Sequence, residues 1–172
     1  MDVINTVKKT ESPRPGHASY MGGFAADAKE TLKVAIIGLG ARGPTHLAHA
    51  AAAEGTVLVG VCDLYEDAAK RGVETALKAD PERHKGVKVF HGNEHAYRRM
   101  LTETKPDAVW VATPWQSHAA IALDTMNAGA NAFVEVPLAL SIEDMWKIVD
   151  TSERTRRHCM MLENVNYGRE EL

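Results

Sequence analysis

The chain has 172 residues, a formal net charge of −3, and 45% hydrophobic and 25% charged side chains, which is the composition of an ordinary globular protein. A length of this order suits one domain, and leaves no room for a second domain of similar size. The near-neutral charge, with Lys and Arg spread along the chain, argues against nucleic acid as a partner, and no apolar run approaches the ~18 residues of a membrane span.

Residues 1–31 differ from the rest of the chain and are expected to form an N-terminal arm. The beginning of the arm is polar and non-periodic, and two prolines and a glycine follow. The apolar, glycine-rich residues 20–26 suit either a loop packed on the domain or a functional flap. Because Lys8 and Lys9 precede polar residues and not an apolar segment, the arm does not have the pattern of a secretory signal. We therefore expect a cytoplasmic protein, or a periplasmic one if an upstream signal has been lost.

Residues 32–165 alternate short apolar runs with stretches of helical periodicity. The runs expected to be strands are Val34–Ile37, Val57–Cys62, Val87–Phe90, Ala108–Ala112, Ala132–Val136 and Cys159–Leu162. Continuous apolar runs of this kind suit strands that are buried on both faces of a parallel sheet. Helices are expected over 118–128, with Ser117 as the N-cap, and over 142–157. Parallel strands need crossover connections, so the pattern predicts a doubly wound, six-stranded α/β sheet.

A glycine-rich turn follows the first expected strand and opens the first expected helix. The sequence Gly38-Leu39-Gly40-Ala41-Arg42-Gly43 matches GxGxxG, a pattern that indicates dinucleotide binding when it lies between a strand and a helix. Gly38 would permit the tight turn, Gly40 the close approach of a pyrophosphate, and Gly43 close packing of helix and strand. The N-terminus of the helix would then offer free N–H groups to the phosphates.

An acidic residue ends the second expected strand. Asp63 stands 20 residues after Gly43, where a carboxylate can accept hydrogen bonds from the adenosine ribose and would repel a 2′-phosphate. This predicts NAD in preference to NADP, although Arg42 could compensate a phosphate. The alternative for Asp63 is an ordinary aspartate at a strand end.

The fourth expected strand ends in polar and aromatic residues, at the edge where open parallel sheets bind ligands. Thr113 and Pro114 would lie along the cofactor, and Trp115 and Gln116 near its ribose. His118 falls in the first turn of the next helix. Packing is the alternative for Trp115, and packing or capping for His118.

The fifth expected strand ends in a carboxylate between apolar neighbours. Burial of the Glu135 carboxylate costs folding free energy and is unexpected unless the residue has a function. We therefore expect Glu135 to lie at a functional site near a nicotinamide. Tyr167, after the sixth strand, could face the same region or simply pack with its hydroxyl in water. Cys62 and Cys159 have neither metal-ligand nor disulfide spacing and are expected to be core residues, and no metal site is predicted.

These motifs together resemble the Gfo/Idh/MocA group of NAD(P)-dependent enzymes, whose Rossmann domain binds the cofactor. The resemblance rests on the glycine-rich turn, Asp63, Ala112-Thr113-Pro114 with His118, and Glu135-x-Pro137. The group usually has Glu-Lys-Pro in the last motif, with a catalytic Lys. Val136 stands there in this chain, which removes the proton donor of ordinary sugar-alcohol dehydrogenation.

One branch that lacks this Lys is similar over roughly residues 14–172: the NAD-dependent glycosidases of glycoside hydrolase family 109. The similar segments are Ile37–Pro44, Cys62–Asp67, Ala112–Trp115, Val134–Pro137 and His158–Asn164, with Tyr167 following. The resemblance implies a small-molecule glycoside substrate and catalytic roles for Glu135 and Tyr167. It implies hydrolysis by oxidation of the sugar at C3, elimination, addition of water and re-reduction, which departs from the two-carboxylate scheme.

The expected cofactor is NAD, and the expected cofactor-binding residues are Gly38, Gly40, Ala41, Arg42, Gly43, Asp63, Thr113, Pro114, Trp115, Gln116, His118, Glu135, Pro137 and Asn164. Residues 166–172 are interpreted as the start of a substrate domain that this chain lacks, so the chain alone should bind NAD without turnover. A homo-oligomer is compatible with the sequence. The alternatives are a sugar or sugar-alcohol oxidoreductase of the same group and a non-catalytic NAD-binding module.

Overall fold

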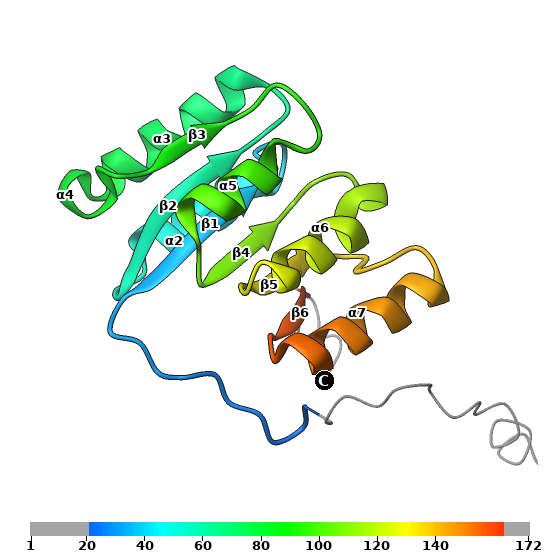
Figure 1. Ribbon diagram of the computed structural model, residues 1–172. Helices are drawn as coiled ribbons and strands as arrows, with labels where there is room; N and C mark the ends of the chain where they lie inside the picture. The colour runs from blue at the N-terminus through cyan, green and yellow to red at the C-terminus, as the bar shows by residue number, and fades with distance from the viewer. Residues whose placement is uncertain (1–20, 164–172) are drawn as a thin grey trace, which may run out of the picture.

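The computed structural model describes residues 21–163, which form a six-stranded sheet with helices on both of its faces (Figure 1). The strand order is β3-β2-β1-β4-β5-β6, and every neighbouring pair is parallel. The chain therefore starts in the middle of the sheet, builds outward to β3, and returns to build the other half from β4. This is the doubly wound order of dinucleotide-binding domains, and it confirms the predicted fold.

The six strands lie where the apolar runs predict them, within about two residues at each end. Their bounds are β1 Leu32–Ile37, β2 Thr56–Cys62, β3 Lys88–Phe90, β4 Ala108–Val111, β5 Asn131–Glu135 and β6 Cys159–Leu162. The described part of the N-terminal arm, 21–31, contains no helix or strand. It is attached to the domain by the ion pair of Lys29 with Asp107 and by Arg156, whose guanidinium lies 4.4 Å from the centre of the Phe24 ring.

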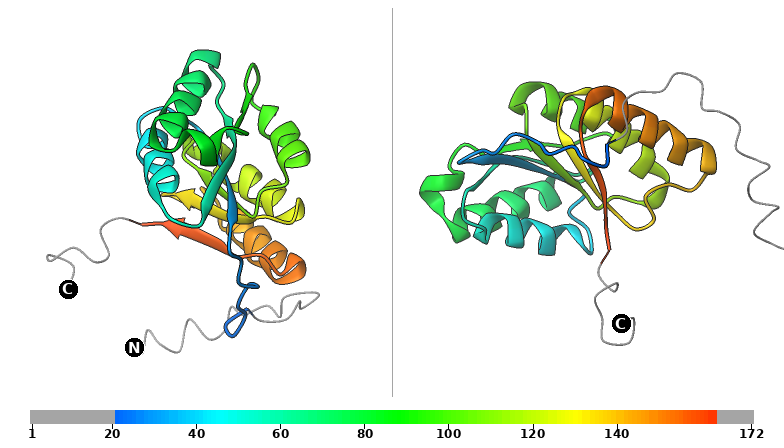
Figure 2. Two further views of the ribbon diagram at one scale, coloured as in Figure 1. Left: turned by 90° about the vertical axis from the view of Figure 1, so that its left-hand side faces the viewer. Right: turned by 90° about the horizontal axis from the view of Figure 1, so that it is seen from below.

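The helices divide between the two faces of the sheet, as Figures 1 and 2 show. Helices α2 and α3 pack together on one face, whereas α5, α6 and α7 cover the other. The bounds are α2 Gly43–Ala52, α3 Glu66–Ala79, α4 Pro81–His84, α5 Ala96–Thr104, α6 Trp115–Asn127 and α7 Ile142–Thr155.

Two apolar cores form because the strands are buried on both faces. Along β1, Val34 and Ile36 enter the core under α2 and α3, and Ala35 and Ile37 enter the core under α5, α6 and α7. All four are at most 3% exposed. The interior therefore fixes the register of β1, because a shift of one residue would exchange its two faces.

Helix α7 begins at the predicted residue, Ile142, whereas α6 begins earlier than predicted. Ser141 Oγ accepts a hydrogen bond from the Asp144 backbone N–H, which caps α7. Gly129, just after α6, has a φ of +89°. The predicted N-cap role of Ser117 is wrong, because α6 begins earlier, at Trp115, after Pro114.

A buried histidine connects α4 to β2 and to the end of α2. His84 is 0% exposed. Its Nδ1 accepts the Leu58 backbone N–H at 3.2 Å, so Nε2 carries the proton and donates to the Ala51 carbonyl at 3.1 Å. The imidazole thus contacts two backbone groups of residues that are themselves 0% exposed, Leu58 and Ala51.

We expect His84→Ala to lower the free energy of unfolding by about 3 kcal/mol, because it leaves a cavity, removes the acceptor of the buried Leu58 N–H, and leaves the Ala51 carbonyl with Arg83 alone. Denaturant unfolding measures the change. The exposed neighbour provides the control, since Lys85→Ala should change the stability by less than about 0.5 kcal/mol. Equal effects of the two substitutions would show that the His84 contacts do not stabilise the fold.

Candidate functional site

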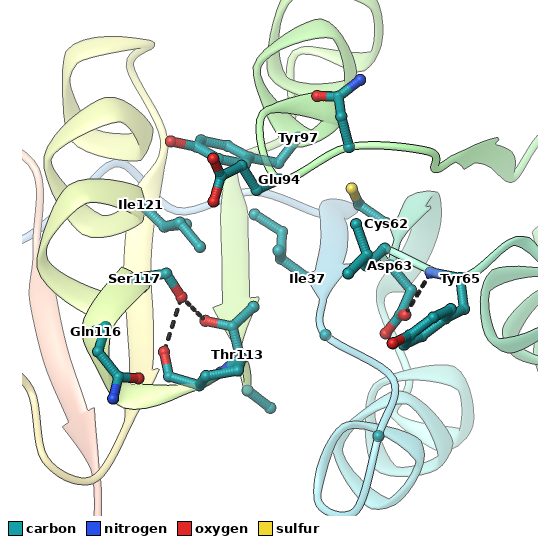
Figure 3. A pocket seen from close by; sticks show the side chains of 16 residues that line it. Ile37, Cys62, Asp63, Tyr65, Glu94, Tyr97, Thr113, Gln116, Ser117 and Ile121 are labelled. Carbon is teal, nitrogen blue, oxygen red and sulfur yellow. Dashed lines mark hydrogen bonds between the residues drawn. The ribbon is translucent and has the colours of Figure 1, made fainter.

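A cleft of about 520 Å³ opens at the carboxyl ends of β1, β2 and β4 (Figure 3). It lies where the strand order reverses between β1 and β4, the position at which open α/β sheets bind ligands. Its lining residues come from four segments: the end of β1 with the glycine-rich turn, the end of β2 with the loop that follows it, the loop before α5 with the first turn of that helix, and the loop after β4 with the first part of α6.

The three glycines of the turn have the distinct environments that the sequence predicts. Gly38 has a φ of +87°, and a Cβ there would lie 2.5 Å from the Ala112 carbonyl oxygen. A Cβ on Gly43 would lie 1.8 Å from the Gly38 carbonyl oxygen. A Cβ on Gly40 would meet nothing within 4 Å. Gly38 and Gly43 are therefore required by the fold, while Gly40 leaves open space at the cleft.

The N-terminus of α2 is available to an anion. No side chain caps it, and its first turn contains no acidic residue. Pro44 stands at the start of the helix, where an N–H would have no intrahelical partner. Ala41 and Arg42, which precede the helix, are exposed. Unpaired N–H groups and the helix dipole make such an end attractive to phosphate.

Asp63 lies on the β2 side of the cleft, next to the glycine-rich turn (Figure 3). One carboxylate oxygen accepts the Leu39 backbone N–H at 2.7 Å, and the other accepts the Tyr65 backbone N–H at 2.9 Å. Each oxygen keeps a further lone pair for a ligand hydroxyl. The carboxylate thus holds the turn and the β2 loop together at the place where a ribose is expected.

Residues after β4 form the opposite wall of the cleft. Thr113, Pro114 and Gln116 line it. Ser117 also lines it, and its hydroxyl donates to Thr113 Oγ1 at 2.7 Å and lies 2.8 Å from the Pro114 carbonyl oxygen. Trp115 is not among the lining residues and is 59% exposed.

His118 occupies the interior between two loops. It is 0% exposed and does not line the cleft. Its Nδ1 lies 2.7 Å from the Pro137 carbonyl oxygen, and its Nε2 lies 2.8 Å from the Thr113 carbonyl oxygen. The ring therefore joins the loop after β4 to the loop after β5, where the Val136–Pro137 peptide bond is cis. Both His118 and Pro137 are placed to shape the site through the backbone.

Glu135 ends β5 beside α2 and is not one of the residues that line the cleft. Its side chain is 12% exposed, and its Oε1 lies 2.6 Å from His46 Nε2 and 3.5 Å from Arg42 Nε. Its Oε2 accepts the Val136 backbone N–H at 3.3 Å. Burial pushes the pKa of Glu135 upward, but the His46 hydrogen bond and charge, the Val136 N–H and Arg42 outweigh burial and hold the pKa below its usual range.

Several residues of the cleft were not predicted from the sequence. Tyr65, Asn93, Glu94 and Tyr97 all line it. The Tyr97 hydroxyl donates to Asp124 Oδ2 at 2.7 Å, and burial together with this bond raises the pKa of Tyr97 to about 12. A position directly after a strand is the signal that could have found Asn93 and Glu94, because all strand ends of a parallel sheet meet at one edge.

The prediction that Cys62 is a core residue is confirmed. Cys62 is buried in the core and lines the cleft, and burial raises the pKa of its thiol to about 12. Asn164 and Tyr167 lie outside the described residues.

Across 21–163, no group of three or more His, Cys, Asp or Glu side chains is arranged to hold a metal ion. No helix in this range is long and apolar enough to cross a membrane.

Comparisons with known proteins identify the family of the chain. The sequence model of a family described as "Oxidoreductase family, NAD-binding Rossmann fold" matches residues 32–163. A protein of Akkermansia muciniphila named glycosyl hydrolase family 109 protein 2 is 52% identical over 94% of this chain and 33% of its own length. The α-N-acetylgalactosaminidase of Shewanella oneidensis is 41% identical over 98% of this chain and 36% of its own length. The chain thus spans about a third of the length of these curated relatives.

Solved structures extend the comparison to the fold. An NAD-binding protein from Listeria innocua has a TM-score of 0.67 and 27% identity, over 83% of this chain and 38% of its own. The myo-inositol dehydrogenase from Lactobacillus casei, in complex with NAD(H) and myo-inositol, has a TM-score of 0.66 and 26% identity, over 81% of this chain and 38% of its own. The matched residues, the strand order and the glycine-rich turn together show that the chain belongs to the Gfo/Idh/MocA oxidoreductase family and carries its NAD-binding Rossmann domain.

Proposed function

We propose that the chain binds NAD in the cleft between β1, β2 and β4, as the cofactor-binding part of a glycosidase that acts on α-N-acetylgalactosaminides. The observation that carries the cofactor proposal is the open space at Gly40 between the N-terminus of α2 and the Asp63 carboxylate. A pyrophosphate needs the open space at Gly40 and the N-terminus of α2. An unphosphorylated ribose needs the Asp63 carboxylate.

The proposal gives each segment of the site one part of the cofactor to bind. The adenosine half would occupy the cleft, with its ribose at Asp63. The pyrophosphate would lie over Gly40 at the uncapped end of α2. The nicotinamide half would then extend past Thr113 toward the carboxyl end of β5, where Glu135 lies.

The glycosidase proposal rests on the named relatives and on the residue between Glu135 and Pro137. The resemblance to the wider group would place a catalytic Lys at this position. Val136 cannot exchange a proton, so the proton lost when a sugar hydroxyl is oxidised would have to pass to another group of the intact protein. Bound NAD would supply reversible removal and return of a hydride at the sugar, so no cofactor would be consumed. Glu135 contributes an ionised carboxylate beside that half of the site.

Other residues prepare the site without contacting the substrate. His118 fixes the loops after β4 and β5 relative to each other. Asp63 holds the glycine-rich turn through the Leu39 N–H.

The family likeness to a myo-inositol dehydrogenase supports one competing proposal, in which the intact protein is a sugar or sugar-alcohol oxidoreductase.

The test needs a protein that contains this chain and spans the full length of the family 109 relatives. This protein is incubated with NAD and an aryl α-N-acetylgalactosaminide. We expect release of the aryl group without net formation of NADH, and no turnover by the 172-residue chain alone. Accumulation of NADH with a sugar or sugar alcohol, without cleavage of the glycoside, would contradict the glycosidase proposal and favour the oxidoreductase.

A further inference from the structure

Glu135 and His46 form a contact that the fold builds from distant parts of the chain. They are 89 residues apart in sequence, and His46 Nε2 lies 2.6 Å from Glu135 Oε1. The side chains are 16% and 12% exposed, respectively. Such a short, partly buried hydrogen bond to a carboxylate is stronger than a bond between neutral groups.

The surroundings of His46 fix its ring in place. The edge of the His46 ring meets the Trp110 ring at an angle of 80°, with the ring centres 5.7 Å apart. His46 stands on α2, one turn after the glycine-rich turn, and Trp110 stands on β4. Three elements of the site, α2, β4 and β5, are thus joined through this one imidazole.

We propose that His46 is a positioning residue that keeps the Glu135 carboxylate ionised and fixed in one orientation toward the nicotinamide half of the site, where it favours oxidised NAD over reduced NAD. This inference rests on the proposed function, because it takes the nicotinamide to lie at the end of β5. The nicotinamide ring is a cation in NAD⁺ and neutral in NADH, so a nearby carboxylate attracts the oxidised form selectively.

The charged groups around Glu135 support this role. Burial alone would favour the neutral carboxylic acid, and the contacts that oppose burial are those of His46, the Val136 N–H and Arg42. Arg42 is the weaker partner, because its Nε is 3.5 Å away and its side chain is 51% exposed. Loss of His46 would therefore remove the principal side-chain partner of the carboxylate and raise the pKa of Glu135.

The experiment compares the dissociation constants of NAD⁺ and NADH for the 172-residue chain by calorimetry between pH 5 and pH 8. We expect Glu135→Gln to lower the ratio of the NADH constant to the NAD⁺ constant by about tenfold at every pH. His46→Ala should lower this ratio in the same direction, and more at pH 5 than at pH 8, because the released Glu135 takes up a proton at the lower pH. His46→Gln, which keeps an N–H donor, should restore part of the ratio and tests the inference if the alanine variant does not fold.

The matched control is His49→Ala, which removes an exposed histidine from the same helix and should leave the ratio unchanged. Titration of the Glu135 carboxyl carbon by NMR provides a readout without cofactor, and its pKa should rise in His46→Ala only. If the unsubstituted chain binds neither nucleotide, the proposed function fails and the inference fails with it. If it binds both, and His46→Ala changes neither the ratio nor the Glu135 titration, only the inference is overturned.

Discussion

Gly43→Ala is expected to destabilise the domain by about 3 kcal/mol and to abolish NAD binding. The added Cβ would lie 1.8 Å from the Gly38 carbonyl oxygen, a backbone atom that cannot move without opening the turn. The space between β1 and α2 would have to widen, and the N-terminus of the helix would leave the position at which it meets the pyrophosphate. Denaturant unfolding and calorimetric titration with NAD measure the two effects.

The turn itself supplies the control for this substitution. At Gly40 the added Cβ would meet nothing within 4 Å, so Gly40→Ala should leave the free energy of unfolding within about 1 kcal/mol of its original value. It should nevertheless weaken NAD binding, because the methyl group occupies the space through which a pyrophosphate approaches. A Gly40→Ala chain that binds NAD as well as the unsubstituted chain would refute the assignment of the pyrophosphate to this turn.

Asp63→Ala should weaken NAD binding by at least about tenfold and reduce the preference for NAD over NADP. The carboxylate accepts two backbone N–H groups, those of Leu39 and Tyr65, and its remaining lone pairs face the cleft. Its removal deprives the ribose of its acceptor, releases the turn, and lifts the repulsion of a 2′-phosphate. Parallel titrations with NAD and NADP give both quantities.

Asp67→Ala is the matched control for charge, because Asp67 is an exposed aspartate in the first turn of α3 that pairs with Arg71 outside the cleft. It should leave both affinities unchanged. An unchanged preference for NAD in Asp63→Ala, or an equal change in Asp67→Ala, would show that Asp63 does not read the ribose.

The parts of the fold and site that follow from local sequence could be predicted. The parallel, doubly wound sheet follows from apolar runs separated by helices, since parallel strands require crossover connections of one hand. The separate environments of Gly38, Gly40 and Gly43 follow from a six-residue motif between a strand and a helix. Asp63 follows because it ends the next strand along the chain, so its distance from the turn is set by the fold class.

The remaining features depend on contacts between distant segments. The pairing of His46 with Glu135 could not be predicted, because it joins residues 89 positions apart across a sheet whose register the sequence does not give. His118 was predicted to bind the cofactor, but its ring is buried between two carbonyl groups. The start of α6 at Trp115 was missed because Pro114 and Ser117 are both common before the first turn of a helix.

The most direct test of the central claim is a calorimetric titration of the 172-residue chain with NAD and, separately, with NADP. We predict one NAD site per chain, with an affinity at least about tenfold higher for NAD than for NADP, since the Asp63 carboxylate would accept a ribose hydroxyl and repel a 2′-phosphate. The absence of NAD binding, or tighter binding of NADP, would contradict the account.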